Sequence, residues 1–379
     1  MKIGIVCYPT FGGSGVIATE LGKALADKGH EIHFITYNQP VRLEHFNTKI
    51  SYHEVTISNY PLFEFVPYET ALTSKMVDVV NFEKLDLLHV HYAIPHASAA
   101  YMAKMILREK GFNIPVVTTL HGTDITLVGK NPNYLPVVTF AMNQSDGLTT
   151  VSESLKNETY NNFDVRKEIA VIPNFIDLKR FSKLPKDHFR RAIAPNNEKL
   201  VVHTSNFRKV KRVQDVVYTF HKILKAVPSK LLLIGDGPER TSIEQLCREL
   251  EITHEVRFLG KQEAIEEILS VSDLFIMPSE TESFGLAALE AMACQVPVIS
   301  TNSGGMPELN VNGVTGYLSN VGDVDDMAAH SIEILSDEDK LAKFKANALN
   351  HARKFDINLI MPQYEKFYQK IVDECRETV

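Results

Sequence analysis

Short apolar runs alternate with longer amphipathic segments along the whole chain. Apolar runs of buried-strand length are followed by segments whose apolar residues recur at helical spacing. Strands are predicted in the first half at 2–7, 31–36, 87–92, 116–120 and 147–151. In the second half they are predicted at 200–204, 231–235, 256–260, 274–277 and 298–301. This alternation indicates βαβ units with parallel sheets, an α/β doubly wound fold.

The length of 379 residues predicts two domains, because it exceeds what one hydrophobic core usually organises. The boundary is predicted near 171–177, before a segment rich in charge and Pro. The amphipathic segment 357–375 either completes the second domain or crosses back onto the first. With the crossover, the first domain is 1–172 plus 356–379 and the second is 173–355. Ligands bind at the carboxyl ends of parallel strands, so a site is expected in a cleft between the domains.

Composition narrows the class of protein. Hydrophobic residues make up 44% and charged residues 23%, as in soluble globular proteins. The net charge of −7 and the lack of a long basic run argue against a nucleic-acid partner. The four cysteines lack C-x-x-C spacing, which argues against a zinc site and fits a reducing cytosol. With no signal peptide or membrane-length apolar run, we expect a cytoplasmic protein without stable membrane association.

Two glutamates separated by seven residues frame a predicted helix start. Glu282 falls in the loop after strand 274–277, and Glu290 falls about two turns into the helix that begins near Leu286. At Gly285 the free N–H groups and the positive end of the helix dipole suit a phosphate. Carboxylates on either side can accept hydrogen bonds from sugar hydroxyls. The segment predicts a nucleotide-sugar site; the alternative is two surface glutamates favoured only by the dipole.

A glycine-rich loop, Gly12-Gly13-Ser14-Gly15, follows the first strand and opens the first helix. Its glycines let backbone N–H groups approach an anion. Residues 13–18 also match the dinucleotide pattern G-x-G-x-x-A, so an NAD-binding domain is an alternative. Two features count against it: loop 8–11 is long for that turn, and the second strand ends without a carboxylate for the ribose. A plain glycine turn is the other alternative.

Polar groups follow two further strands of the first half. His121, beside a glycine at a strand end, can donate to a sugar hydroxyl or a developing charge. In the alternative, Asp124 caps the next turn and His121 has no role in ligand binding. His89 and His91 share one strand face, where buried hydrogen-bonded histidines are favoured over a metal site without a third ligand. Tyr92 stands at that strand's end, within reach of the expected cleft.

Four cations follow the first strand of the second half, before a helix. They are Arg208, Lys209, Lys211 and Arg212. Their position predicts a diphosphate clamp, with a solvated basic face as the alternative. Asp323-Val324-Asp325 resembles a D-x-D metal motif, but it is better interpreted as a helix N-cap with an acidic first turn.

Together these motifs resemble family-four retaining glycosyltransferases of GT-B fold, whose two doubly wound Rossmann-like domains face each other across a cleft. The resemblance rests on segments 282–290, 12–15, 208–212 and 304–308, and it spans nearly the whole chain. Segments 12–20, 121–126 and 205–215 look most like family members that act in bacillithiol biosynthesis. The resemblance implies transfer of N-acetylglucosamine from UDP-N-acetylglucosamine to the hydroxyl of L-malate, giving an α-glycoside and UDP. The alternative is a lipid or sugar acceptor.

The resemblance also implies residue roles. The expected catalytic residues are His121, Arg208, Lys211, Arg212 and Glu282. The expected donor-binding residues are Gly13, Gly15, Asn206, Lys261, Gln262, Ser283, Phe284, Gly285, Leu286 and Glu290. The expected acceptor-binding residues are Ser14, Tyr92, Asn206 and Arg208. The family's phosphate lysine usually precedes G-x-D; the aligned residue is Arg212, with Lys211 beside it, so which one neutralises the leaving UDP stays open.

Retention without a convincing enzymic nucleophile suggests front-face attack, with the departing phosphate taking the proton. Because cations and a helix end neutralise the diphosphate, we expect no metal or other cofactor. The aromatic stretch 60–68 could touch a bilayer, but residues 1–172 carry 14 Lys+Arg and 17 Asp+Glu, which disfavours anionic membranes. We expect that stretch to be core or a subunit contact, and a homo-oligomer stays open. A non-catalytic sugar-binding protein and a sugar-nucleotide epimerase are alternatives of other classes.

Overall fold

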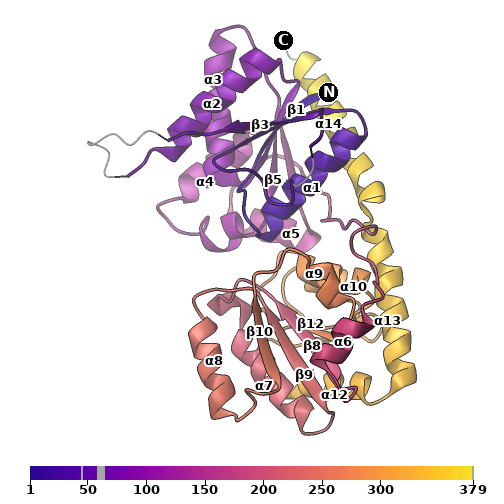
Figure 1. Ribbon diagram of the computed structural model, residues 1–379. Helices are drawn as coiled ribbons and strands as arrows, with labels where there is room; N and C mark the ends of the chain where they lie inside the picture. The colour runs from indigo at the N-terminus through magenta and orange to yellow at the C-terminus, as the bar shows by residue number, and fades with distance from the viewer. Residues whose placement is uncertain (44–45, 58–64, 378–379) are drawn as a thin grey trace. The chain divides into compact units, whose positions relative to one another are not determined.

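The computed structural model describes residues 1–43, 46–57 and 65–377 (Figure 1). The chain divides into two compact units. The N-terminal unit comprises Met1–Asn174 and Ile357–Val379, and the C-terminal unit comprises Phe175–Asp356. Each unit has a parallel sheet with helical connections, so the predicted α/β doubly wound fold is confirmed for both.

The N-terminal unit is built on a parallel sheet with the strand order β3-β2-β1-β4-β5-β6-β7. Its strands are β1 Lys2–Val6, β2 Glu31–Thr36, β3 Ile50–Glu54, β4 Leu87–His91, β5 Val116–Leu120, β6 Gly147–Thr150 and β7 Ile169–Val171. Its helices are α1 Gly13–Asp27, α2 Tyr68–Glu83, α3 Ser98–Glu109, α4 Leu135–Gln144, α5 Glu153–Asn162 and α14 Ile357–Glu377, with π-turns η1 Ala93–Ala97 and η2 Thr123–Leu127. Helices α2 and α3 lie on one side of the sheet, and α1 and α14 lie on the other (Figure 1).

The last helix, α14, belongs to the N-terminal unit although it follows the C-terminal unit in sequence. Its Tyr364 and Tyr368 are fully buried, and the Tyr368 hydroxyl lies 2.7 Å from His89 Nδ1. A Cβ at Gly147 would lie 2.8 Å from the Phe367 ring, so this glycine lets the helix approach β6. The terminal segment therefore packs back onto the first sheet.

The C-terminal unit is built on a parallel sheet with the strand order β10-β9-β8-β11-β12-β13. Its strands are β8 Lys199–Thr204, β9 Ser229–Ile234, β10 Val256–Gly260, β11 Leu274–Met277, β12 Val298–Thr301 and β13 Gly316–Ser319. Its helices are α6 Asp187–Ile193, α7 Val213–Leu224, α8 Arg240–Glu249, α9 Ile265–Leu269, α10 Leu286–Ala293, α11 Met306–Leu309, α12 Val324–Leu335 and α13 Glu338–Ala352, with 3₁₀ turns η3 Lys209–Lys211 and η4 Arg353–Phe355. Phe220, Leu233, Ile276 and Phe344 pack in the core between these layers.

The ten predicted strands are all present, with ends shifted by at most two residues. Three strands escaped prediction: β3, β7 and β13. All three are edge strands of their sheets, and β7 has only three residues. β3 is largely exposed, so it lacks the apolar run of a buried strand. Asp323 accepts a hydrogen bond from the Asp326 N–H at the start of α12, which confirms the N-cap interpretation.

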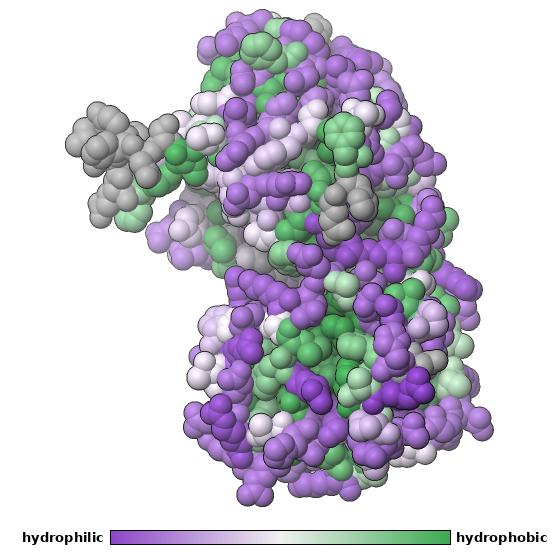
Figure 2. Space-filling view, in the orientation of Figure 1, coloured by the Kyte–Doolittle hydropathy of each residue, from purple (hydrophilic) through white to green (hydrophobic). Residues whose placement is uncertain are grey.

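The surface in Figure 2 mixes hydrophilic and hydrophobic residues on the face that it shows. Within the described part of the chain, no helix is both long enough and apolar enough to span a bilayer. The aromatic stretch 60–68 falls largely outside the described residues. Phe65, which is described, is 81% exposed and so does not belong to the core.

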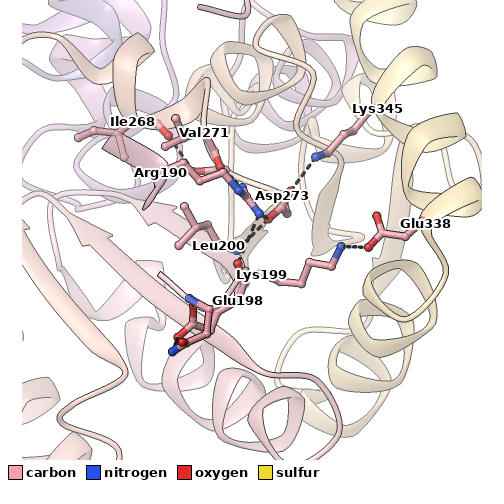
Figure 3. Close-up of polar contacts among 11 residues, drawn as sticks. Arg190, Glu198, Lys199, Leu200, Ile268, Val271, Asp273, Glu338 and Lys345 are labelled. Atoms are coloured by element: carbon pink, nitrogen blue, oxygen red, sulfur yellow. Dashed lines mark hydrogen bonds and ion pairs between the residues drawn. The ribbon is translucent and has the colours of Figure 1, made fainter. Parts of the chain in front are cut away.

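A buried carboxylate joins four segments of the C-terminal unit (Figure 3). Asp273 accepts hydrogen bonds from Arg190 Nη2 at 2.7 Å, Lys345 Nζ at 2.7 Å and the Leu200 N–H at 2.9 Å. Burial alone would raise the pKa of Asp273, but the charges of Lys345 and Arg190 hold it below its usual value. This carboxylate thereby connects α6, α13, the start of β8 and the entry to β11.

We predict that Asp273→Asn destabilises the protein by about 2–3 kcal/mol at neutral pH, because two cations lose their partner. The pKa of Asp273 in the folded protein lies below the ordinary 3.8, so the stabilisation by its carboxylate is complete well above pH 3.8. The stabilisation is lost as the pH falls through the pKa of Asp273 in the folded protein. Urea unfolding at neutral pH and at about pH 3 measures the difference, which shrinks in acid.

The matched control is Asp325→Asn. Asp325 pairs with Lys222 at 2.7 Å but is 85% exposed, so its loss changes stability by less than about 0.5 kcal/mol. Equal effects of the two variants at neutral pH would contradict the role given to Asp273.

Candidate active site

Two loops of the C-terminal unit, together with the helix that follows the second loop, carry six of the ten predicted donor residues. One follows β8 and leads through η3 into α7, and the other follows β11 and leads into α10. β8 and β11 are neighbours in the sheet, so the loops leave the same edge side by side. The loop after β8 approaches the loop after β9 closely at Gly237. A Cβ at this position would lie 2.1 Å from the Asn206 carbonyl oxygen, so the approach requires a glycine.

An ion pair joins these two loops. Lys211 Nζ lies 2.6 Å from Glu282 Oε1, and their side chains are 21% and 12% exposed. The Ser279 hydroxyl donates to the same oxygen at 2.7 Å. Sequence reasoning found Lys211 and Glu282 but missed Ser279, whose only signal is its place just after a strand. The three side chains form a polar cluster beside the start of α10.

The other predicted cations are placed differently. Arg212 is in the left-handed region with φ 47°, and its Nε donates to Asp215 Oδ2 at 2.6 Å. Its guanidinium also lies near Gly322, where an added Cβ would come within 3.3 Å. Arg208 and Asn206 are exposed on the loop before η3. The structure therefore separates Lys211, which faces Glu282, from Arg212, which is tied to its own helix.

Helix α10 begins at a glycine that nothing else can easily replace. Gly285 has φ 94°, and an added Cβ would lie 2.4 Å from Met306 Sδ. The N-cap residue Gly285 has no side chain with which to cap this helix start, whose first N–H groups lack partners within the helix. The preceding loop is fixed by the Gly305 N–H, which donates to the Glu282 carbonyl at 2.8 Å. The helix start can therefore present N–H donors and its dipole to an anion.

The other predicted donor residues of the C-terminal unit lie around this helix start and on the loop after β10. Phe284 is buried against Phe355, with ring centroids 5.6 Å apart, so only its backbone is available to a ligand. Ser283 is half-buried, and Leu286 is the first residue of α10. Glu290 is 5% exposed. Lys261 and Gln262 are exposed just after β10.

The glycine-rich loop of the N-terminal unit packs against its own helix. Gly13 begins α1, and a Cβ at Gly15 would lie 2.4 Å from the Tyr8 carbonyl oxygen. Gly15 is thus required by loop packing within the chain. The Ser14 hydroxyl lies 2.8 Å from the Tyr92 hydroxyl, which brings together two predicted acceptor residues. Tyr92 has φ 84°, a strained conformation at the tip of β4.

Histidines gather at the ends of β4 and β5. His91 Nδ1 lies 2.7 Å from His121 Nε2, and His96 donates from Nδ1 to the His91 carbonyl. Burial lowers the pKa of His121 to about 3 and that of His96 to about 4, and it places that of His91 well below normal. These imidazoles are neutral at pH 7. His89 bonds Thr119 and Tyr368, so the interpretation of His89 and His91 as hydrogen-bonded core residues is confirmed.

Asp124 organises this region more than its sequence position indicated. Its carboxylate accepts hydrogen bonds from the N–H groups of Ala93 at 3.0 Å, Gly122 at 3.0 Å and His121 at 3.3 Å. Burial raises the pKa of Asp124 to about 6, although the backbone donors oppose the shift. The carboxylate caps the turn, as one alternative held, and also ties the loop after β4 to the loop after β5. His121 is half-buried and held in this network.

Two family models match the chain. Glycosyltransferase Family 4 matches residues 11–180, and Glycosyl transferases group 1 matches residues 185–351. The N-acetyl-alpha-D-glucosaminyl L-malate synthase of Bacillus anthracis is 48% identical over 98% of this chain and 97% of its own length. An uncharacterised glycosyltransferase of Methanocaldococcus jannaschii is 30% identical over 93% of each chain.

Solved structures share the fold. Anabaena HepE, solved in complex with UDP and glucose, has a TM-score of 0.82 and 22% identity, covering 97% of this chain and 99% of that one. Sucrose-phosphate synthase of Thermosynechococcus elongatus has a TM-score of 0.81 and 22% identity, covering 99% and 100%. The family models and near-full-length relatives together show that this chain belongs to the family-four, group 1 glycosyltransferases of GT-B fold.

Proposed function

We propose that this glycosyltransferase moves N-acetylglucosamine from UDP-N-acetylglucosamine to the hydroxyl of L-malate, with retention, giving an α-glycoside and UDP. The observation that carries the proposal is the 48% identity, over nearly the full length, to a relative named for synthesis of that product. The buried thiols of Cys7, Cys247 and Cys294 support a reducing, cytoplasmic setting.

The C-terminal unit offers a site for the donor. Lys211 supplies a cation and the α10 start supplies N–H groups, so the two can neutralise a diphosphate. Glu282 and Glu290 then accept from sugar and ribose hydroxyls, and Lys261 and Gln262 border the base. Arg208, exposed on the neighbouring loop, adds a second cation. Because these groups supply the positive charge, no divalent metal is required.

The reaction then needs positioning and charge stabilisation more than an enzymic base. The acceptor hydroxyl forms a bond to the anomeric carbon on the face that UDP leaves, and the bond from that carbon to the phosphate oxygen breaks. The hydroxyl proton passes to the departing phosphate. Lys211 stabilises the charge that develops on UDP. We assign this role to Lys211 because its partner, Glu282, is itself a proposed site residue, whereas Arg212 is paired with Asp215 at the start of its own helix.

His121 is better suited to hydrogen bonding than to charge. Its pKa of about 3 keeps the imidazole neutral, and its Nε2 is engaged by His91. Its other ring nitrogen is the group proposed to bind a donor-sugar hydroxyl. For the acceptor, Ser14 and Tyr92 offer paired hydroxyls, and burial raises the pKa of Tyr92 to about 12, so this phenol stays protonated. The backbone of the glycine loop completes this part of the proposed malate site.

The first prediction is that UDP release from UDP-N-acetylglucosamine depends on L-malate and persists in a metal chelator. D-malate and buffer without acceptor serve as controls. Proton NMR of the product shows a small axial–equatorial anomeric coupling, as retention requires. If the donor binds and L-malate leaves it intact, the malate assignment is wrong and lipid or sugar acceptors are tested next.

We predict that Lys211→Met lowers kcat about 100- to 1,000-fold, because the developing charge on UDP loses its counter-charge. Arg212→Met is the matched control, because it replaces the neighbouring cation with the same uncharged residue. This variant lowers kcat less than about tenfold, because the guanidinium of Arg212 donates its hydrogen bond to Asp215. Steady-state UDP release measures both variants, and the reverse order of effects would give the phosphate role to Arg212.

On the acceptor side, Tyr92→Phe and Ser14→Ala are expected to raise KM for malate about tenfold, the worth of one or two hydrogen bonds. The KM for UDP-N-acetylglucosamine stays within about twofold, because these hydroxyls are not assigned to the donor. Equal increases in both constants would show that the hydroxyl pair serves the donor or the fold instead.

A further inference from the structure

A group of three metal-ligating side chains lies outside the residues assigned to catalysis. His33 is on β2, His53 is on β3 and Glu83 is the last residue of α2. One ligand atom from each lies within 4.8 Å of the other two. His33 Nδ1 is 3.0 Å from His53 Nε2, a hydrogen bond that an ion bound to both nitrogens would replace. Two nitrogens on a tetrahedral zinc ion, each about 2.0–2.1 Å from the metal, would be about 3.3 Å apart.

The sheet register explains why the histidines meet. His33 pairs with Ser51, and side chains two residues apart on a strand share a face. His53 therefore lies diagonally opposite His33 on the same face of the sheet, and the rings stack with centroids 5.3 Å apart. Helix α2, which contacts β2, brings Glu83 to this face. The three ligands come from three elements far apart in sequence.

Glu83 occupies an unfavourable position for a purely structural carboxylate. It ends α2, where the negative end of the dipole disfavours a second negative charge. The last turn within the helix contains no basic residue, and the first cation after it is the C-cap residue Lys84. Lys84 follows in the left-handed conformation with φ 57° and closes the helix. A bound cation between Glu83 and the two imidazoles would relieve this repulsion.

The surroundings keep the histidines available as ligands. Burial lowers the pKa of His33, and Glu83 opposes the shift; burial likewise lowers the pKa of His53. The charged groups that face His33 are Glu83, Lys2 and Glu31, and those that face His53 are Glu83, Lys75 and Asp78. Neutral imidazoles are the form that binds metal. His33 is buried, whereas His53 and Glu83 are half-exposed, so an ion can enter from their side.

We propose that His33, His53 and Glu83 bind one divalent transition-metal ion of the zinc type, with solvent at the fourth position. Two imidazoles and one carboxylate are a donor set that zinc accepts, and they disfavour the oxygen-seeking Mg²⁺ and Ca²⁺. The ion fastens edge strand β3 and the end of α2 to β2. It is separate from the proposed transfer reaction, which draws on none of these side chains.

Zinc titration of chelator-treated, full-length protein against a chromophoric zinc indicator tests the proposal. The wild type takes up one equivalent. His53→Ala and Glu83→Gln each weaken binding at least about tenfold, since even outer-shell changes cost about 10- to 100-fold. The matched control, His254→Ala, removes an exposed histidine from the other unit and leaves binding unchanged. Zinc uptake that persists in both variants, or no uptake by the wild type, would overturn the proposal.

Two further readouts separate a built site from loss of folding. Cobalt(II) added to the wild type gives visible d–d absorption of a four-coordinate site, and this absorption is absent from Glu83→Gln, whose size and shape match glutamate. Zinc raises the Tm of the wild type and not that of the variants, because only the folded site binds the ion. Both variants keep malate-dependent UDP release. A cobalt spectrum unchanged in Glu83→Gln would remove the carboxylate from the site.

Discussion

The arrangement of the strand-end loops around the start of α10 depends on the contacts of Glu282. Its carboxylate binds Lys211 from the loop after β8 and Ser279 from the loop after β11. Its carbonyl oxygen accepts from Gly305 on the loop after β12. A Cβ at Gly304 would lie 2.1 Å from that oxygen, so the approach demands glycine there. One residue thus fixes three strand-end loops around the start of α10.

In the N-terminal unit, a different carboxylate residue holds the strand-end loops together. Asp124 collects three backbone N–H groups from the loops after β4 and β5. In both units a carboxylate between neighbouring loops orders the segments that a parallel sheet leaves at its carboxyl edge. The difference is in charge. Glu282 is paired with a cation, whereas Asp124 meets only dipoles and a low-dielectric surrounding, so the pKa of Asp124 rises to about 6.

The sequence was informative where a signal is local. Gly285, Glu282 and Glu290 lie within nine residues of one another, and buried strands such as β11 are continuous apolar runs. Contacts between distant residues were not predictable. Nothing local separates Lys211 from Arg212 until the structure places the first against Glu282, 71 residues away. The exposed edge strand β3 carries no strong pattern, so the meeting of His33 and His53 was hidden as well.

The two units differ in the electrostatics of their predicted site residues. The histidines at the ends of β4 and β5 are neutral, so they can donate and accept hydrogen bonds without adding charge. Cations instead follow β8, on the loop next to the one that leads into α10, whose N-cap residue is the glycine Gly285. A leaving diphosphate gains charge as its bond to the sugar breaks, and fixed cations and N–H dipoles stabilise that gain without reorganising. Neutral donors suit sugar hydroxyls, whose charge does not change. In the proposed mechanism, the C-terminal unit therefore carries the groups that stabilise the transition state, and the N-terminal unit carries those that orient the substrates.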